Sequence, residues 1–232
     1  LCIYRGVLDN DFLNCYTFKQ HQISRGTEMK AENIVKGSFR NIVNAYNNAT
    51  ESSMTEGTNW YPDAHLIALQ VTTLAHSTDV SVGAGILASL SPALSWEKNV
   101  EQAIRFTGTG NSTQTKANND KAVLITCGVN PDEVLGGYKV TAFYHAILNP
   151  TGQYKPVVDR HALAVYFGKT LTDKQIKQCF GNARVMKRVQ HAYLRASKIL
   201  GVHYNVVQAV TWVQHRKNKG LVRVNPWDKE QR

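Results

Sequence analysis

Cysteine is scarce in this chain of 232 residues, which holds only Cys2, Cys15, Cys127 and Cys179. They form no CxxC pair and no zinc-like spacing, and the closely spaced C-terminal cysteines that hold an iron–sulfur cluster are missing. We therefore expect free thiols in a cytoplasmic protein. The eight histidines contain no HExxH motif, so the sequence indicates no metal site and no cofactor.

Long hydrophobic runs are absent too. No apolar stretch reaches the roughly 18 residues that a membrane span needs, so we expect no membrane partner. The first residues lack a basic segment followed by a long apolar run, so they do not look like a secretory signal. We predict that residues 1–30 are a leader or poorly ordered segment and that residues 31–232 form the folded domain.

Acidic residues become rare after residue 138. Residues 1–138 hold 10 Lys and Arg against 13 Asp and Glu, whereas residues 139–232 hold 17 against 4, a net charge of +13. A segment with this charge favours a polyanionic partner, most often nucleic acid. A basic surface that contacts only water is the alternative.

Strand patterns are scarce, and nearly every patterned segment has the spacing of an amphipathic helix. We predict an all-α fold, a two-lobed helical bundle with a cleft between lobes that divide near the polar loop 107–118. Pro62 is predicted in a first helical turn, after a loop over 47–59, and the tail 221–232 as a strand or extended arm. The expected helices are 31–47, 60–77, 79–92, 95–106, 121–128, 139–148, 159–168, 184–201 and 205–220.

Gly136, Gly137 and Tyr138 directly precede Lys139 at a predicted helix start. Glycines at such a start let backbone N–H groups approach an anion, and the helix N-terminus favours negative charge. This turn can therefore grip a DNA phosphate. A plain glycine turn beside a surface lysine is the alternative.

Asp159 follows in the sequence as the expected N-cap of the next helix. A capping carboxylate has a fixed direction, which suits stabilisation of a positively charged sugar or deprotonation of a nucleophile. Arg160 and His161 beside it could bind phosphate or tune the site. Taken alone, the pattern is also that of an ordinary helix cap.

Together these motifs resemble the helix-hairpin-helix (HhH-GPD) DNA glycosylase superfamily, in which a glycine hairpin opens a helix and a V-D-x-H motif follows at a similar distance. Here the hairpin reads LGGYKVTAF and the later motif VVDRH. The stretch LASLSPALSWEKNVEQAI is similar to the family's helix-turn-helix near the flipped base. The similarity spans roughly residues 60–215, and the chain looks like a divergent member, similar to phage-associated and anti-phage glycosylases.

The resemblance implies a DNA glycosylase that flips a modified base into a pocket and hydrolyses its N-glycosidic bond, with Asp159 stabilising the sugar cation or activating water. It also implies Lys139 as an amine nucleophile that would form a Schiff base and add an AP-lyase activity. A register moved by one residue places Val140 there instead, so the lyase activity stays open.

Further site residues follow from their type and position. Trp60 and Tyr61 at a helix start could stack on a flipped base, and Trp96 could form a wall of the pocket. The alternatives are a hydrophobic staple for Trp60 and Tyr61 and a core position for Trp96. Trp212 is predicted as a core residue. The predicted base pocket consists of Trp60, Tyr61, Ser91, Trp96 and His161. The predicted DNA contacts are Gly136, Gly137, Tyr138, Arg160, Lys187, Arg188 and Arg195. Lys187, Arg188 and Arg195 lie on one predicted helix, and a solvated face of that helix is the alternative for them.

We expect a monomer that acts on double-stranded DNA. The divergent hairpin lacks the family's proline, and no glutamine matches the one that often inserts at the base. These departures suggest that the substrate is an unusual base. We expect glucosylated 5-hydroxymethylcytosine in phage DNA as that substrate and antiviral defence as the role of the protein. The alternatives are a non-enzymatic DNA-binding module on the same fold and a base-modifying transferase that leaves the base attached.

Overall fold

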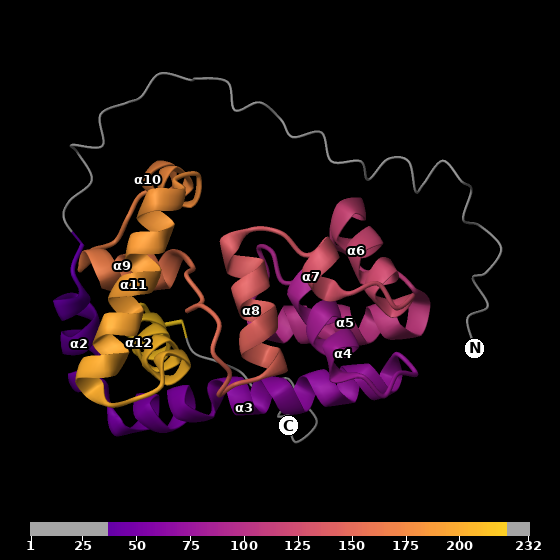
Figure 1. Cartoon of the computed structure of the whole chain (residues 1–232), viewed down its shortest axis with the longest axis horizontal. Helices are drawn as coiled ribbons and strands as arrows, with labels where there is room; N and C mark the ends of the chain where they lie inside the picture. Colours follow the sequence, from indigo (N-terminus) through magenta and orange to yellow (C-terminus); the bar gives the residue numbers. More distant parts are fainter. Residues whose placement is uncertain (1–36, 222–232) are drawn as a thin grey trace. The chain divides into compact units, whose positions relative to one another are not determined.

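The computed structural model describes residues 37–221, which belong to a compact unit that begins at Lys36. All regular structure in this range is helical, which confirms the all-α prediction for the described residues. The predicted leader, residues 31–36 of the first predicted helix and nearly all of the tail lie outside them. With the labels of Figure 1, the helices are α2 (Phe39–Asn47), α3 (Glu51–Leu74), α4 (Val80–Leu90), α5 (Trp96–Thr109), α6 (Lys116–Thr126), α7 (Pro131–Val134), α8 (Tyr138–Leu148), α9 (Arg160–Phe167), α10 (Asp173–Phe180), α11 (Ala183–Leu200) and α12 (Tyr204–Asn218).

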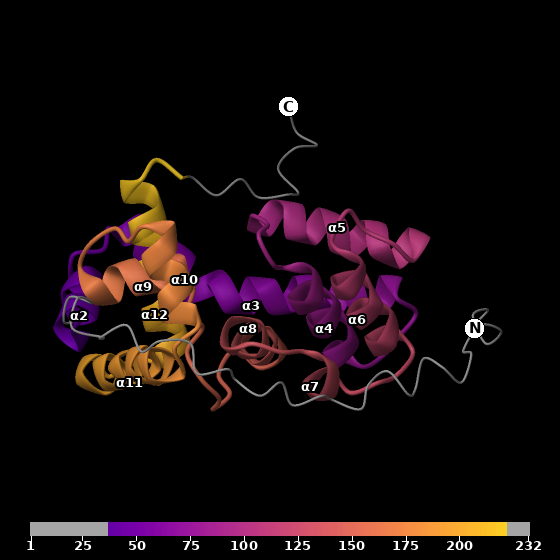
Figure 2. The same cartoon turned by 90° about the horizontal axis from the view of Figure 1, so that it is seen from above.

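The 24-residue helix α3 connects two groups of helices. Its first half packs against α12, where Gly57 lies so close to the backbone of Val210 that a side chain would not fit. Its second half packs against α4, where Gly83 lies so close to the backbone oxygen of Ala68 that a side chain would not fit there either. Helices α4 to α8 therefore form one group, and α2 with α9 to α12 form the other, as Figure 1 and, from above, Figure 2 show.

Helix α3 corrects two predictions, the loop over 47–59 and the helix start near Pro62. The helix begins at Glu51, with Thr50 as its N-cap, and carries Pro62 in its interior. The polar residues after position 50 have little intrinsic reason to be helical. They are held by α12, where the side chain of Gln214 accepts a hydrogen bond from the Thr50 N–H at 2.9 Å. Packing against a partner helix outweighs local propensity here.

The loop predicted over 107–118 is shorter in the structure, because α5 continues to Thr109 and α6 begins at Lys116. Helices α5 and α6 both pack against α4. The two groups of helices are therefore not divided at this loop. The chain passes from the first group to the second in the segment between α8 and α9.

Helix α10 is absent from the sequence-based prediction. It starts with a capping box in which Thr172 and Gln175 exchange side-chain and backbone hydrogen bonds, a signal that was present in the sequence. Only Ile176 and Cys179 of its eight residues are buried. The apolar pattern was therefore too short to mark a helix by periodicity.

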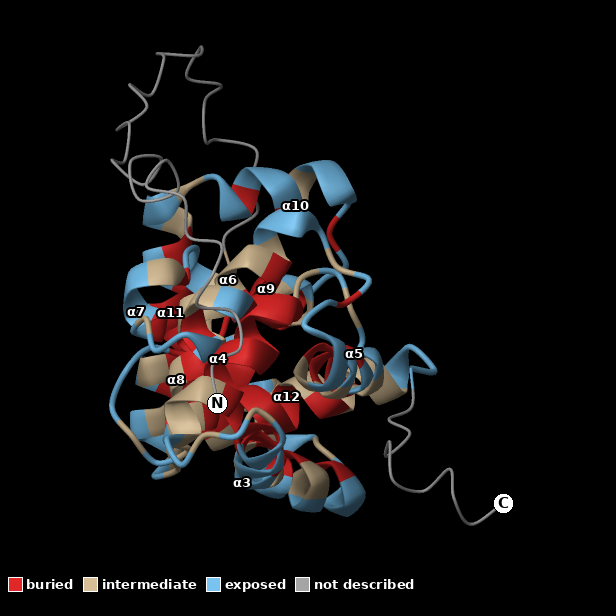
Figure 3. Ribbon diagram, turned by 90° about the vertical axis from the view of Figure 1, so that its right-hand side faces the viewer, coloured by how far each residue is buried: buried red, intermediate tan, exposed pale blue. Residues whose placement is uncertain are grey.

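Burial is concentrated on the inward faces of α4, α9 and α12, while α10 and the outer face of α3 are exposed (Figure 3). Residues 83–90 of α4 and 162–167 of α9 are all buried. These enclosed helices fix the positions of Ser91 and Asp159, which stand at their ends. Within residues 37–221, none of the helices has the length and hydrophobicity that crossing a membrane requires.

Candidate functional site

A pocket of about 680 Å³ lies where the start of α9 faces α3, α5, α8 and α12. Residues from both groups of helices line it. They include every residue that the sequence predicts for catalysis or for the base pocket, although the roles themselves stay predictions. These residues are Trp60, Tyr61, Ser91, Trp96, Lys139, Asp159 and His161, joined by Arg160, Asn99, Phe143, Gln208, Trp212 and Arg216.

Asp159 is the N-cap of α9, as predicted. Its Oδ1 accepts hydrogen bonds from the backbone N–H groups of His161 at 2.9 Å and Ala162 at 2.8 Å. Its Oδ2 accepts one from the indole Nε1 of Trp212 at 2.8 Å. A carboxylate has about four lone-pair sites, so three donors leave Asp159 a fixed direction and little capacity to accept more hydrogen bonds.

Lys139 reaches the pocket from the first turn of α8. Val140, the next residue, packs against the hydrophobic core instead. Lys139, and not Val140, is therefore the residue of this turn that lines the pocket.

The start of α8 has no side-chain cap. Its N-cap is Gly137, with a φ of 83° in the left-handed region that favours glycine. Gly136, Gly137 and Tyr138 are exposed, and none of them lines the pocket. The first-turn N–H groups therefore lack the side-chain partner that most helix starts have.

Aromatic rings form one wall of the pocket. The ring centroid of Trp60 lies 4.6 Å from that of Trp212 and 5.8 Å from that of Trp96, which in turn lies 6.2 Å from Phe143. Trp60 and Trp96 are only 5% and 6% exposed, so they belong to the core and to the pocket wall at once. Such a rigid wall suits the stacking of a flat ligand.

Tyr61 lies in the same wall and is buried. Its hydroxyl donates a hydrogen bond to Oε1 of Gln208 at 2.7 Å. Burial, with a smaller contribution from the charge of Asp159, raises the pKa of Tyr61 well above its usual value. The phenol therefore stays neutral and orients the amide of Gln208.

Two buried polar atoms of the wall have no hydrogen-bond partner among the described residues, Nε1 of Trp96 and Oδ1 of Asn99. A buried group left unpaired costs about 1–3 kcal/mol. Both atoms are out of reach of solvent, so a ligand could not pair them without movement of the wall. Ser91 differs, because its Oγ already donates to the carbonyl of Ala88 at 2.9 Å.

His161 lines the pocket and contacts a second histidine on α12. Its Nδ1 lies 3.1 Å from Nδ1 of His215. Burial lowers the pKa of His161, an effect that Asp159 opposes and Arg216 reinforces. Burial and the neighbouring His161 lower the pKa of His215 to about 4. Both rings are therefore neutral near pH 7.

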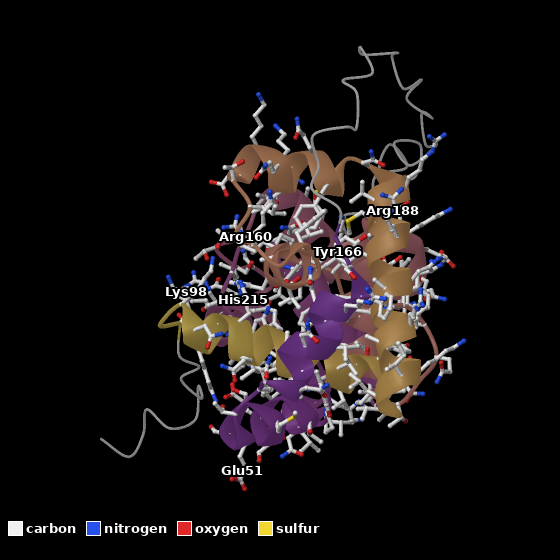
Figure 4. All side chains as sticks on the ribbon, turned by 90° about the vertical axis from the view of Figure 1, so that its left-hand side faces the viewer. Glu51, Lys98, Arg160, Tyr166, Arg188 and His215 are labelled. Atoms are coloured by element: carbon white, nitrogen blue, oxygen red, sulfur yellow. The ribbon has the colours of Figure 1, made fainter. Side chains whose placement is uncertain are left out.

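The basic residues predicted to contact DNA lie in two places. Arg160 lines the pocket, whereas Lys187, Arg188 and Arg195 are exposed on α11 and line no part of it. Figure 4 shows Arg188 on the opposite side of the view from Arg160. Arg195 also has a packing role, because its guanidinium lies 3.9 Å from the ring centroid of Phe39.

Comparison with known proteins adds a family but no activity. The model of a "Family of unknown function (DUF7178)" matches residues 24–219. The chain belongs to this family. No curated protein matches the chain. No solved structure matches it either.

Trp212 of this DUF7178 member is predicted as a core residue, and it does pack against the hydrophobic core. It is only partly buried, however, and it also donates to Asp159, a contact that the sequence-based prediction missed. The guanidinium of Arg216 lies 4.5 Å from its ring centroid. Gln208, Trp212 and Arg216 recur every fourth residue and so share one face of α12. This polar spacing around a tryptophan was the available signal.

Proposed function

We propose that the protein is a DNA glycosylase of the helix-hairpin-helix type, which breaks the N-glycosidic bond of a flipped, modified base and leaves an abasic site. One observation carries the proposal: the carboxylate of Asp159, held by three donors, lines the same aromatic-walled pocket as Lys139. Fixed charge, amine and stacking surface are the parts that this reaction needs.

The aromatic wall is suited to hold the base. A base inside a duplex is out of reach of an enzyme, so it is flipped out at a cost of about a few kcal/mol. The partly buried rings of Phe143 and Trp212 offer surface on which it can stack, and Trp60 and Trp96 behind them keep the wall rigid.

Asp159 is suited to stabilise the developing charge. As the glycosidic bond breaks, positive charge appears on the sugar. An anion whose direction is fixed before the reaction stabilises that charge without having to reorganise. The three hydrogen bonds of Asp159 supply this preorganisation.

In this proposal the helix-hairpin-helix element consists of α7, the turn at Gly136 and Gly137, and α8. The two groups of helices are the two lobes, and the pocket is the cleft between them. The uncapped start of α8 would bind a phosphate through its backbone N–H groups. Arg160 would add charge at the pocket. The exposed Lys187 and Arg188 on α11 would contact the DNA backbone without reading sequence.

The volume of the pocket favours a base with a bulky substituent. Pockets of roughly 300–1,000 Å³ hold drug-sized ligands, and about 680 Å³ is more than a bare base would fill. We extend the proposal to glucosylated 5-hydroxymethylcytosine in phage DNA, with antiviral defence as the role.

Base release tests the proposal directly. The purified chain is incubated with phage DNA that carries glucosylated 5-hydroxymethylcytosine and with unmodified DNA, and free base is measured by mass spectrometry. Release from modified DNA, lost in Asp159→Asn, is the expected result. Binding without release from either DNA would support a non-enzymatic DNA-binding module instead. Conversion of the base while it stays attached would support a transferase.

A further inference from the structure

Asp159 is badly placed to take a proton, because its two oxygens already accept three hydrogen bonds. Hydrolysis nevertheless requires the attacking water to lose one. We propose that His161 takes this proton and that His215 is a positioning residue that fixes the tautomer of His161. The inference rests on the proposed glycosylase activity.

The contact between the two rings requires one of them to be the donor, and we assign that role to His161. A hydrogen bond between two Nδ1 atoms needs a proton on one and a lone pair on the other, and the distance here is 3.1 Å. When His161 is the donor, its lone pair is on Nε2, which has no partner among the described residues and belongs to a ring that lines the pocket. This tautomer makes Nε2 the proton acceptor.

His215 is in a position to hold that tautomer. Its ring borders a second pocket of about 380 Å³, between α2, α9 and α12, and not the one that holds Asp159. With its Nδ1 accepting from His161, its own proton is on Nε2. The partner of a catalytic histidine acts in the same way when it fixes which nitrogen carries the proton.

The surrounding charges keep the pair neutral. Around His161 the pKa is lowered by burial and by Arg216, Lys219 and Arg160, against the opposing charge of Asp159. Helices α2 and α11 also pack against α9. Three of their arginines contact other rings: Arg40 and Arg195 lie over the ring of Phe39, and the charge of Arg188 lowers the pKa of Tyr166 against the effect of burial. A neutral imidazole is the form that can accept a proton.

The water oxygen bonds to C1′ while one of its protons moves to Nε2 of His161. The C1′–N bond breaks, and its electron pair leaves with the base. The imidazolium then returns the proton to the departing base, so that abasic sugar and free base are the products.

Nitrogen NMR on the full chain tests the tautomers without any substrate. We expect His161 in the Nδ1–H form and His215 in the Nε2–H form at pH 7. In His215→Phe, which keeps a ring but removes the acceptor, His161 should revert to the usual Nε2–H form, and His215→Asn, whose Oδ1 can accept, should keep it. An Nε2–H tautomer of His161 in the unaltered chain would overturn the assignment, whether or not base is released.

Kinetics on modified DNA test the role. A general base contributes about 10²–10⁴-fold, so His161→Gln should lower kcat about a hundredfold with little change in KM. His215→Phe should lower kcat less and alter its pH profile, and His215→Asn should restore both. His203 is a matched control, since burial lowers its pKa as well and it lies outside the pocket. Its side chain caps α12, and the asparagine of His203→Asn can do the same. This variant should therefore behave as the unaltered chain. Base release that is unaffected by His161→Gln would refute this inference and leave the glycosylase proposal standing.

Discussion

The starts of α8 and α9 meet at one pocket and are built in opposite ways. At α9 the first N–H groups are occupied by the carboxylate of Asp159, which also accepts from Trp212. At α8 the cap is Gly137, which has no side chain, and no other side chain caps the helix. One start therefore carries its own anion, and the other has room for an anion from outside.

Under the proposed function, this difference would separate two tasks that a glycosylase has to combine. The fixed internal anion would stabilise positive charge on the sugar, and the open helix start would bind the negative phosphate next to it. Lys139 stands in the first turn of the open helix, so it would reach the sugar from the phosphate side. The first three predictions each change one of the two helix starts and leave the other as it is.

The largest effect is expected for Asp159→Asn. Asparagine is as good an N-cap as aspartate, so α9 should keep its stability while the negative charge is lost and the new amide meets the N–H of Trp212. We expect base release in single-turnover assays to fall at least about a hundredfold, whereas the melting temperature should fall only by the few degrees, about 2–4 °C, that the lost hydrogen bond to Trp212 costs.

Asp79 provides the control for this change. It caps α4 and accepts a hydrogen bond from the Ser81 N–H at 2.9 Å, but it does not line the pocket. Asp79→Asn should leave base release unchanged. If both variants lost activity equally, the loss would reflect helix capping and not the charge at the site.

The second effect concerns Lys139 as a nucleophile. If its amine forms a Schiff base with C1′, borohydride should trap a covalent complex between the chain and modified DNA. Lys139→Gln should abolish the trapped band on a denaturing gel, whereas Lys98→Gln, an exposed lysine that does not line the pocket, should not. Base release without any trapped complex would mean hydrolysis alone.

A smaller effect is expected for Gly137→Ala. The φ of 83° together with a ψ of 143° would strain any side chain by about 1–3 kcal/mol, although open space surrounds the added Cβ. Gly110 is the control, with a φ of 72° and equally open space, but its ψ of 5° is the αL conformation, which other residues adopt more easily. Gly137→Ala should therefore lose more stability than Gly110→Ala in thermal melts, and only Gly137→Ala should weaken DNA binding of the folded chain, by about three- to tenfold in Kd. Equal binding by the two variants would exclude a phosphate at this helix start.

The contrast between these helix starts also shows how far the sequence could be read. Both starts were predictable, because a glycine pair and an aspartate mark helix N-termini locally. That Asp159 and Lys139 share a pocket was expected only from the resemblance to a family. The helical course of residues 51–59 and the bond from Trp212 to Asp159 were missed, since both depend on how α12 packs against distant segments. Local patterns record the ends of helices but not their partners.

The smallest effect is on stability at acidic pH. The unfolded chain protonates histidine near pH 6.5, whereas in the folded chain the pKa values of His161 and His203 are lowered and that of His215 is about 4. Below pH 6.5 the unfolded state therefore binds more protons, so the free energy of unfolding should fall as the pH is lowered from 6.5 to about 4. Above pH 6.5 the contribution of these histidines to stability is fully present. The lowered pKa of Asp79 acts only below this window. Because the ring of His215 is partly exposed, we expect it to account for about 1–2 kcal/mol, less than the shift alone implies. Urea unfolding at pH 7 and pH 4.5 should show a smaller loss of unfolding free energy for His215→Phe than for the unaltered chain. An equal loss in both proteins would mean that the two rings are not held neutral against each other.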